Sequence, residues 1–104
     1  MPNFQPYECH VTVAPPATAS KRKWFESLAL AQGWKTSEIA GDPLLGQKNF
    51  FYFTTHAKVY EDIYGKMEKL AAHLSDDREI QVLRKKIEHI VFDTGKKLLK
   101  KEQL

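Results

Sequence analysis

The sequence contains little cysteine and no long apolar run. Cys9 is the single cysteine among 104 residues, so no disulfide can form within the chain and a metal site can use one thiolate at most. No apolar stretch approaches the roughly 20 residues that a membrane-spanning helix needs. The first residues, MPNFQPYE, show neither the basic nor the apolar region of a secretory signal. We therefore expect a soluble, cytoplasmic protein with no membrane partner.

A strong excess of charge of one sign is also missing. Lysine and arginine number 16 against 13 for aspartate and glutamate, which gives a net charge of +3. Two short clusters, at residues 21–23 and 96–101, hold seven of the 16 basic residues. A solvated helix start and a basic tail explain these clusters as well as nucleic-acid binding does.

The patterning predicts one folded domain. Hydrophobic residues make up 42% of the chain and charged residues 28%, which is ordinary for a globular protein. Strands are predicted at residues 7–13, 34–40, 48–56 and 82–93, and helices at 21–33 and 60–74. The order β-α-β-β-α-β predicts a ferredoxin-like α+β fold, in which a four-stranded antiparallel sheet carries both helices on one face. We expect this domain to span residues 1–95, followed by a basic tail, 96–104, that forms a frayed amphipathic helix.

The alternation of side chains along each strand predicts a site on the uncovered face of the sheet. In the first strand, Cys9, Val11 and Val13 are expected under the helices, which turns every second residue to the opposite face. The same alternation in two other strands adds polar and aromatic groups. The residues expected on the uncovered face are Glu8, His10, Thr12, Phe50, Tyr52, Thr54, His56, Arg84, Lys86 and Glu88.

The register of the last strand has two solutions. If Leu83, Ile87 and Val91 face inward, alternation turns the apolar residues at 82, 90 and 92 to the outward face. Because apolar residues are not expected there, we predict a bulge near residues 88–90. A slip of the whole strand by one residue would instead bring His89 and Lys85 to the uncovered face. We favour the first solution.

One tripeptide suggests an enzyme. His10-Val11-Thr12 resembles the His-x-Thr motif of the two-histidine phosphoesterases, which implies metal-independent hydrolysis of cyclic phosphate esters in RNA or nucleotides. In such a reaction one imidazole takes a proton from water and another protonates the leaving oxygen. Under this hypothesis His10 is the acid or base, Thr12 and Arg84 hold phosphate, and Glu8 or Glu88 orients an imidazole or pairs with a base. The catalytic candidates are His10, Thr12 and Glu88. The second imidazole would come from His56, from His89, or from a second copy of the chain.

The main expectation is a module that binds a ligand or a second copy of itself through the uncovered face. Residues 48–52, KNFFY, resemble the third-strand motif of RNA-recognition domains, so nucleotide or RNA binding is a further alternative. An anionic ligand would be attracted by two bases, and an aromatic ring would pack against it. The ligand-binding candidates are Glu8, Tyr52, His56, Arg84 and Lys86. A homodimer would bury Phe50 and Tyr52.

No metal or cofactor is expected from the local motifs. Glu8, His10 and His56 form in principle a set of two histidines and one carboxylate. No local spacing such as HExxH supports a metal site, and no phosphate-binding glycine motif is present.

Overall fold

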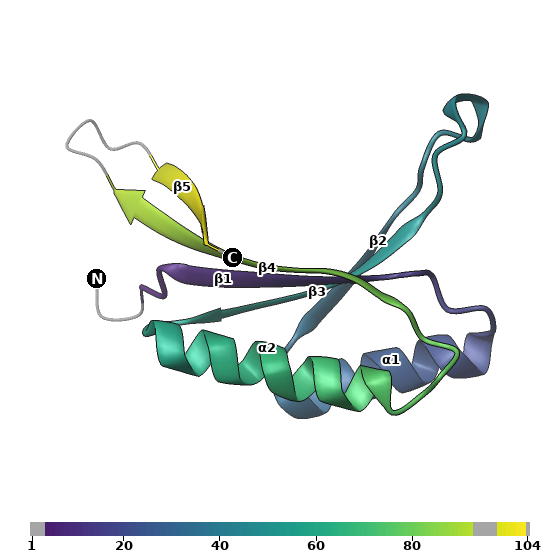
Figure 1. Cartoon of the computed structure of the whole chain (residues 1–104), viewed down its shortest axis with the longest axis horizontal. Helices are drawn as coiled ribbons and strands as arrows, with labels where there is room; N and C mark the ends of the chain where they lie inside the picture. The colour runs from purple at the N-terminus through teal and green to yellow at the C-terminus, as the bar shows by residue number, and fades with distance from the viewer. Residues whose placement is uncertain (1–3, 93–97, 104) are drawn as a thin grey trace.

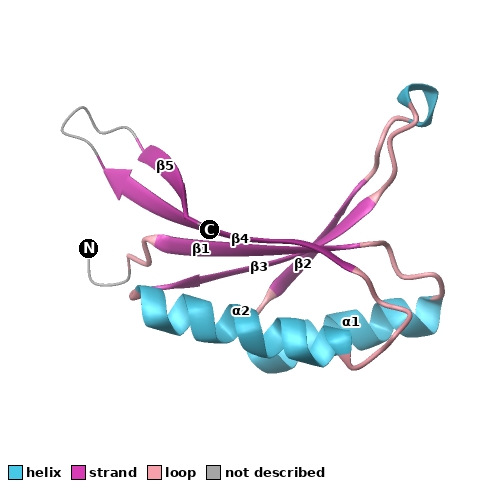
Figure 2. Ribbon diagram, in the orientation of Figure 1, coloured by secondary structure: helices cyan, strands magenta, loops and turns pink. Residues whose placement is uncertain are grey.

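The computed structural model describes the backbone of residues 4–92 and 98–103 and the side chains up to residue 90 (Figures 1 and 2). Two helices cover one face of a single antiparallel sheet whose strand order is β2-β3-β1-β4-β5. The elements are β1 (Tyr7–Val13), α1 (Ala19–Gln32), β2 (Lys35–Ile39), the short 3-10 helix η1 (Pro43–Leu45), β3 (Phe50–Ala57), α2 (Tyr60–Ser75), β4 (Val82–Phe92) and β5 (Leu98–Gln103). The order β2-β3-β1-β4, with two helices, confirms the predicted ferredoxin-like α+β fold.

The fifth strand corrects the prediction of a helical tail. Residues 98–103 pair antiparallel with β4, from Ile87 opposite Gln103 to Phe92 opposite Leu98. A long strand such as β4, with 11 residues, offers a row of backbone donors and acceptors at an open edge, and a following segment can satisfy them. This pairing overrides the weak helical preference of a lysine-rich segment. The predicted domain boundary at residue 95 lies outside the described residues.

The helices begin and end where local chemistry favours it. Thr18 is the N-cap of α1, and its Oγ1 accepts a hydrogen bond from the backbone N–H of Lys21 at 3.1 Å. Gly33 ends the helix with φ of 78°, a left-handed conformation that glycine adopts without strain. In the described residues, 4–92 and 98–103, no helix is long and apolar enough to cross a membrane.

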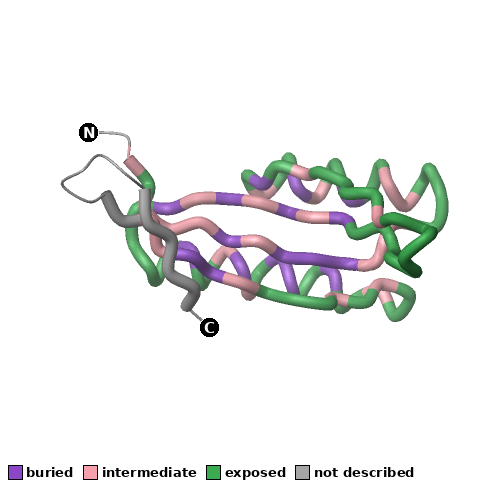
Figure 3. Tube along the Cα trace, turned by 90° about the horizontal axis from the view of Figure 1, so that it is seen from above, coloured by how far each residue is buried: buried purple, intermediate pink, exposed green. Residues whose placement is uncertain are grey.

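The core lies between the helices and the sheet. Burial alternates along β3, whereas the last three residues of β1 are all buried (Figure 3). Phe53 is fully buried, and its ring centroid lies 5.7 Å from that of Phe25 on α1 and 5.4 Å from that of Phe51. On α2, the predicted apolar seam is buried at Ile63, Met67, Leu70 and Leu74. The expected packing of Cys9, Val11 and Val13 under the helices is confirmed, because all three have 0% exposure.

The register of β4 corrects one detail of the prediction. β4 pairs with β1 without a break from Tyr7 opposite His89 to Thr12 opposite Arg84, and then Val13 pairs with Val82. The irregularity therefore lies at Leu83, which is 42% exposed, and not near residues 88–90. Leu83 is not part of the core. Val82, one residue earlier in the chain, packs against the core in its place. The favoured parity of Ile87 is confirmed by its 2% exposure.

Candidate functional site

The face of the sheet that lies away from α1 and α2, called here the open face, carries all of the predicted site residues in cross-strand rows. Register pairs fix these rows, because residues directly opposite in a sheet point to the same side. From β3 through β1 to β4, the rows are His56–Glu8–Glu88, Thr54–His10–Lys86 and Tyr52–Thr12–Arg84. In β5, Glu102 is the register partner of Glu88.

Two carboxylates oppose one another in the first row. Glu8 and Glu88 are direct partners across β1 and β4, and their side chains are only 13% and 6% exposed. Like charges directly opposite in a sheet destabilise it, and low exposure strengthens the repulsion because less water screens it. Lys86 offsets part of this charge, since its Nζ lies 3.1 Å from Oε1 of Glu88.

The imidazole of His10 lies against both carboxylates. Its Nε2 is 3.5 Å from Oε1 of Glu8 and 3.5 Å from Oε1 of Glu88. Its Nδ1 is within hydrogen-bonding distance of Oγ1 of Thr54, at 3.1 Å. The hydroxyl of Thr54 therefore fixes the orientation of the ring and directs Nε2 at the two acids. One ligand atom from each of Glu8, His10 and Glu88, the cluster named here the E-H-E cluster, lies within 4.8 Å of the other two.

A second imidazole, that of His56, lies at the margin of the E-H-E cluster. Nε2 of His56 is 3.5 Å from the same Oε1 of Glu8, and the His56 side chain is 40% exposed. His89 is on the other side of the sheet, where its ring stacks on Tyr7 with centroids 4.7 Å apart. The alternative register, which would turn His89 to the open face, is therefore wrong.

The third row lies farther from the E-H-E cluster. Tyr52, Thr12 and Arg84 are each two residues along their strands from the row of His10, a step of about 6.7 Å. Thr12 is buried, with 8% exposure, whereas Arg84 is exposed. The structure thus brings together Glu8, His10, His56, Lys86 and Glu88, and places the third row beside them.

Cys9 belongs to the covered face although it lies between two members of the E-H-E cluster in the sequence. Burial raises the pKa of its thiol to about 12, and the nearby Lys85 ammonium offsets a smaller part of the shift. A neutral, buried thiol that faces the helices is not a ligand for the open face.

Sequence reasoning missed Thr54 as a partner of His10, and it missed the opposition of Glu8 and Glu88. Both contacts join different strands, so only the register reveals them. It also missed a depression at the end of β3, described below, because its lining comes from segments without a shared motif.

No protein-family model, curated protein or solved structure matches this chain. The fold defines the class, a ferredoxin-like α+β arrangement extended by one strand. Such a fold carries many unrelated functions, so the function is argued from the site alone.

Proposed function

We propose that this protein is a metal-binding module that holds a divalent transition-metal ion on its open face. The ligands are Oε1 of Glu8, Nε2 of His10 and Oε1 of Glu88. The observation that carries the proposal is the convergence of two carboxylates and one imidazole nitrogen on one point of the sheet.

The spacing of the ligand atoms suits a metal better than direct hydrogen bonds. A good N–H···O bond measures about 2.7–3.2 Å, and both nitrogen-to-oxygen distances at His10 are 3.5 Å. A tetrahedral zinc ion with bonds of about 2.1 Å separates its ligand atoms by about 3.4 Å. The two distances at His10 therefore match a coordination shell, and the third separation, between Glu8 and Glu88, is within 4.8 Å.

The charge of the site also favours a cation. Glu8 and Glu88 face each other with little exposure, and a divalent ion between them would replace their repulsion with attraction. The same two carboxylates disfavour an anion beside His10. Lys86 is the competing cation, since its ammonium contacts Oε1 of Glu88, and the metal must displace it from that oxygen.

The surroundings of His10 match those of a metal ligand. A ligating histidine is held through its other ring nitrogen by a neighbouring group, which fixes the tautomer and the ring. Thr54 supplies that contact at Nδ1. An imidazole among the ligands favours zinc or iron over magnesium and calcium, which prefer oxygen ligands. Three protein ligands would leave a position for water or substrate, and His56 is near the site because its Nε2 lies 3.5 Å from Oε1 of Glu8.

Isothermal titration of the full chain with Zn²⁺ tests the proposal. We expect one ion per chain, and a loss of at least about 100-fold in affinity for Glu88→Gln and for His10→Ala, since each removes a ligand. Glu79→Gln and His73→Ala are the matched controls, because both residues are exposed and lie outside the E-H-E cluster. They should bind as the unaltered chain does.

The result can also overturn the proposal. If Zn²⁺ binds as tightly to Glu88→Gln as to the unaltered chain, the ion is held elsewhere. If the unaltered chain binds none of Zn²⁺, Mn²⁺ and Fe²⁺ at micromolar concentration, the cluster is not a metal site.

A second candidate function is metal-independent hydrolysis of cyclic phosphate esters. It is supported by the approach of two imidazoles to one carboxylate oxygen, because Nε2 of His10 and Nε2 of His56 each lie 3.5 Å from Oε1 of Glu8. One ring would act as the base and the other as the acid. This use of His10 excludes metal binding at the same nitrogen.

Hydrolysis of a nucleoside 2′,3′-cyclic phosphate in the presence of EDTA separates the two candidates. Under the second candidate, EDTA leaves the activity intact, and His10→Ala and His56→Ala each abolish it. Absence of hydrolysis in EDTA contradicts the second candidate and leaves the metal proposal to the titration.

A homodimer is a separate proposal, supported by the arm formed by the β2–β3 connection. Leu44 and Leu45 at its tip are 92% and 72% exposed, and Ile39 and Phe50 at its base are also exposed. Large apolar side chains exposed on one segment favour a contact with another chain. Light scattering should give a dimer that Leu44→Asp converts to a monomer, and a monomeric unaltered chain would contradict the proposal.

A further inference from the structure

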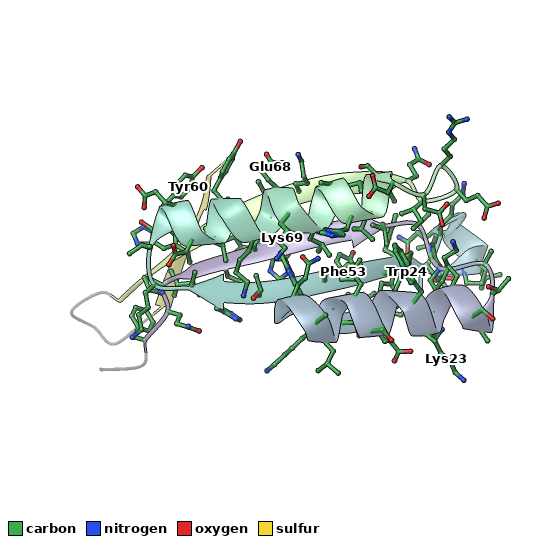
Figure 4. All side chains as sticks on the ribbon, turned by 90° about the horizontal axis from the view of Figure 1, so that it is seen from below. Lys23, Trp24, Phe53, Tyr60, Glu68 and Lys69 are labelled. Atoms are coloured by element: carbon green, nitrogen blue, oxygen red, sulfur yellow. The ribbon has the colours of Figure 1, made fainter. Side chains whose placement is uncertain are left out.

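A depression of about 620 Å³ lies between the end of β3 and the N-terminal half of α2. Figure 4, seen from the helix side, shows that α1 ends short of the end of β3 beside which α2 begins. The residues that line the depression belong to β3, the β3–α2 connection and α2, together with Gln5. No member of the E-H-E cluster lines this depression.

The residues that line the depression include more lysines than acids. Lys58, Lys66 and Lys69 line it, together with Glu61 and Asp62. Lys66 is held in place, because its Nζ donates to Oγ1 of Thr55 at 2.7 Å and to the backbone oxygen of Gly33 at 3.5 Å. An ammonium group fixed in advance loses less freedom when it binds an anion.

Gly65 forms part of the wall, and packing does not explain it. Glycine in a helix interior costs roughly 1 kcal/mol relative to alanine. A Cβ placed at Gly65 would meet no atom within 4 Å, so no neighbour requires the small residue. Gly65 lines the depression, and a side chain at this position would project into that space. A glycine at position 65 is unfavourable in a helix, but its presence is explained if the depression beside it must stay open.

His56 connects the depression to the open face. His56 is one of the residues that line the depression, and its Nε2 lies 3.5 Å from Oε1 of Glu8 in the E-H-E cluster. The depression and the cluster therefore share a neighbouring residue at the end of β3.

We infer that this depression binds a phosphate group of a small molecule, through Lys58, Lys66 and Lys69. Phosphate is favoured over a single carboxylate because its three terminal oxygens can each accept a charge-assisted hydrogen bond from a separate ammonium group. The inference goes beyond the proposed metal function and does not depend on it, because no member of the E-H-E cluster is among the phosphate ligands.

Titration with inorganic phosphate at constant ionic strength, in EDTA and followed by NMR, tests the inference on the full chain. We expect saturable shifts centred on Gly65 and Lys66. Lys69→Met should weaken binding about tenfold, the loss of one charge-assisted hydrogen bond. Lys23→Met is the matched control, since Lys23 is an exposed lysine on α1 (Figure 4), and it should bind phosphate unchanged.

Gly65 provides an independent arm of the experiment. Gly65→Ala should raise the melting temperature and weaken phosphate binding, and Gly65→Leu should abolish binding because it fills the space. A structural glycine would instead lower stability when replaced. Equal phosphate affinity in Lys69→Met and Lys23→Met, or unchanged affinity in Gly65→Leu, would overturn the inference. Because EDTA is present, failure here leaves the metal proposal untouched.

Discussion

The two faces of the sheet are built from the same strands, yet they differ in almost every physical property. Under the helices, alternate residues of β1 and β3 form a dry apolar layer in which Cys9, Val11 and Phe53 have no exposure. On the open face, the residues between them carry acids, imidazoles and hydroxyls that contact one another. The covered face therefore accounts for the fold, and the open face holds groups that the fold alone does not require. Neighbouring residues in one strand provide matched tests of this division.

The largest difference is expected between two adjacent aromatic residues of β3. Phe53 is fully buried against Phe25 and Phe51, so Phe53→Ala should cost about 3–5 kcal/mol in the free energy of unfolding. Tyr52 is half-buried on the open face, and Tyr52→Ala should cost about 1 kcal/mol. Urea denaturation measures both. Equal costs would mean that the open face is packed as tightly as the covered face.

Two adjacent threonines separate stability from binding. Oγ1 of Thr55 donates to the backbone oxygen of Gly33 at 2.8 Å and accepts from Lys66. Thr55→Val should therefore cost about 1–3 kcal/mol and leave zinc affinity unchanged. Thr54→Val removes the contact that orients His10, so it should lower zinc affinity by about 10–100-fold with little change in unfolding measured in EDTA. The reverse pattern would contradict the assignment of the two faces.

Two adjacent lysines of β4 should give a smaller contrast. Lys85 lies 3.5 Å from Oε2 of Glu68, with both side chains more than one-third exposed, so Lys85→Met should change stability by less than about 0.5 kcal/mol. Lys86→Met removes an ammonium group beside a carboxylate that is 6% exposed and should cost about 1 kcal/mol in EDTA. It should also tighten zinc binding, because Lys86 no longer competes for Glu88. Weaker zinc binding in Lys86→Met would argue against that competition.

The smallest effect is expected at the contact between Lys21 on α1 and Asp77, which follows α2. A hydrogen bond from the Lys21 ammonium, and a weaker one from the backbone N–H of Glu79, hold the pKa of Asp77 below its ordinary value. This interaction adds stability above the ordinary pKa of an aspartate and loses it as the pH falls through the lowered pKa. Melting temperatures of the unaltered chain and Asp77→Asn should differ slightly at pH 7 and converge in acid. A difference that persists in acid would assign the effect to packing.

Most of the fold could be predicted because burial repeats with the period of each element. Ile63, Met67, Leu70 and Leu74 revealed α2, and the alternation in residues 7–13 revealed which side of β1 is buried. The strand at residues 98–103 could not be predicted, because the sequence LLKKEQ does not alternate apolar and polar residues and its pairing with the edge of β4 is visible only in the structure. Leu83 was misplaced because a bulge shifts the parity by one residue without a local signal.

The residues of the open face could be predicted from the sequence, but the contacts between them could not. Alternation alone turned Glu8, His10 and Thr12 to one side. That Glu8 faces Glu88, and that Thr54 contacts His10, depends on which residues lie opposite across strands. A local metal-binding spacing is absent from the sequence, because the proposed ligands come from β1 and β4, which are separated by most of the chain.

The separation of β1 and β4 along the chain determines when the site can form during synthesis. β1 and β4 pair only after some 70 intervening residues have been made, and contacts of such long range form late because the loop between them must first close. A nascent chain that has produced β1 alone carries Glu8 and His10 without Glu88. Under the proposed function, the ion would be captured at the end of folding, and its uptake would report that β1 and β4 have paired.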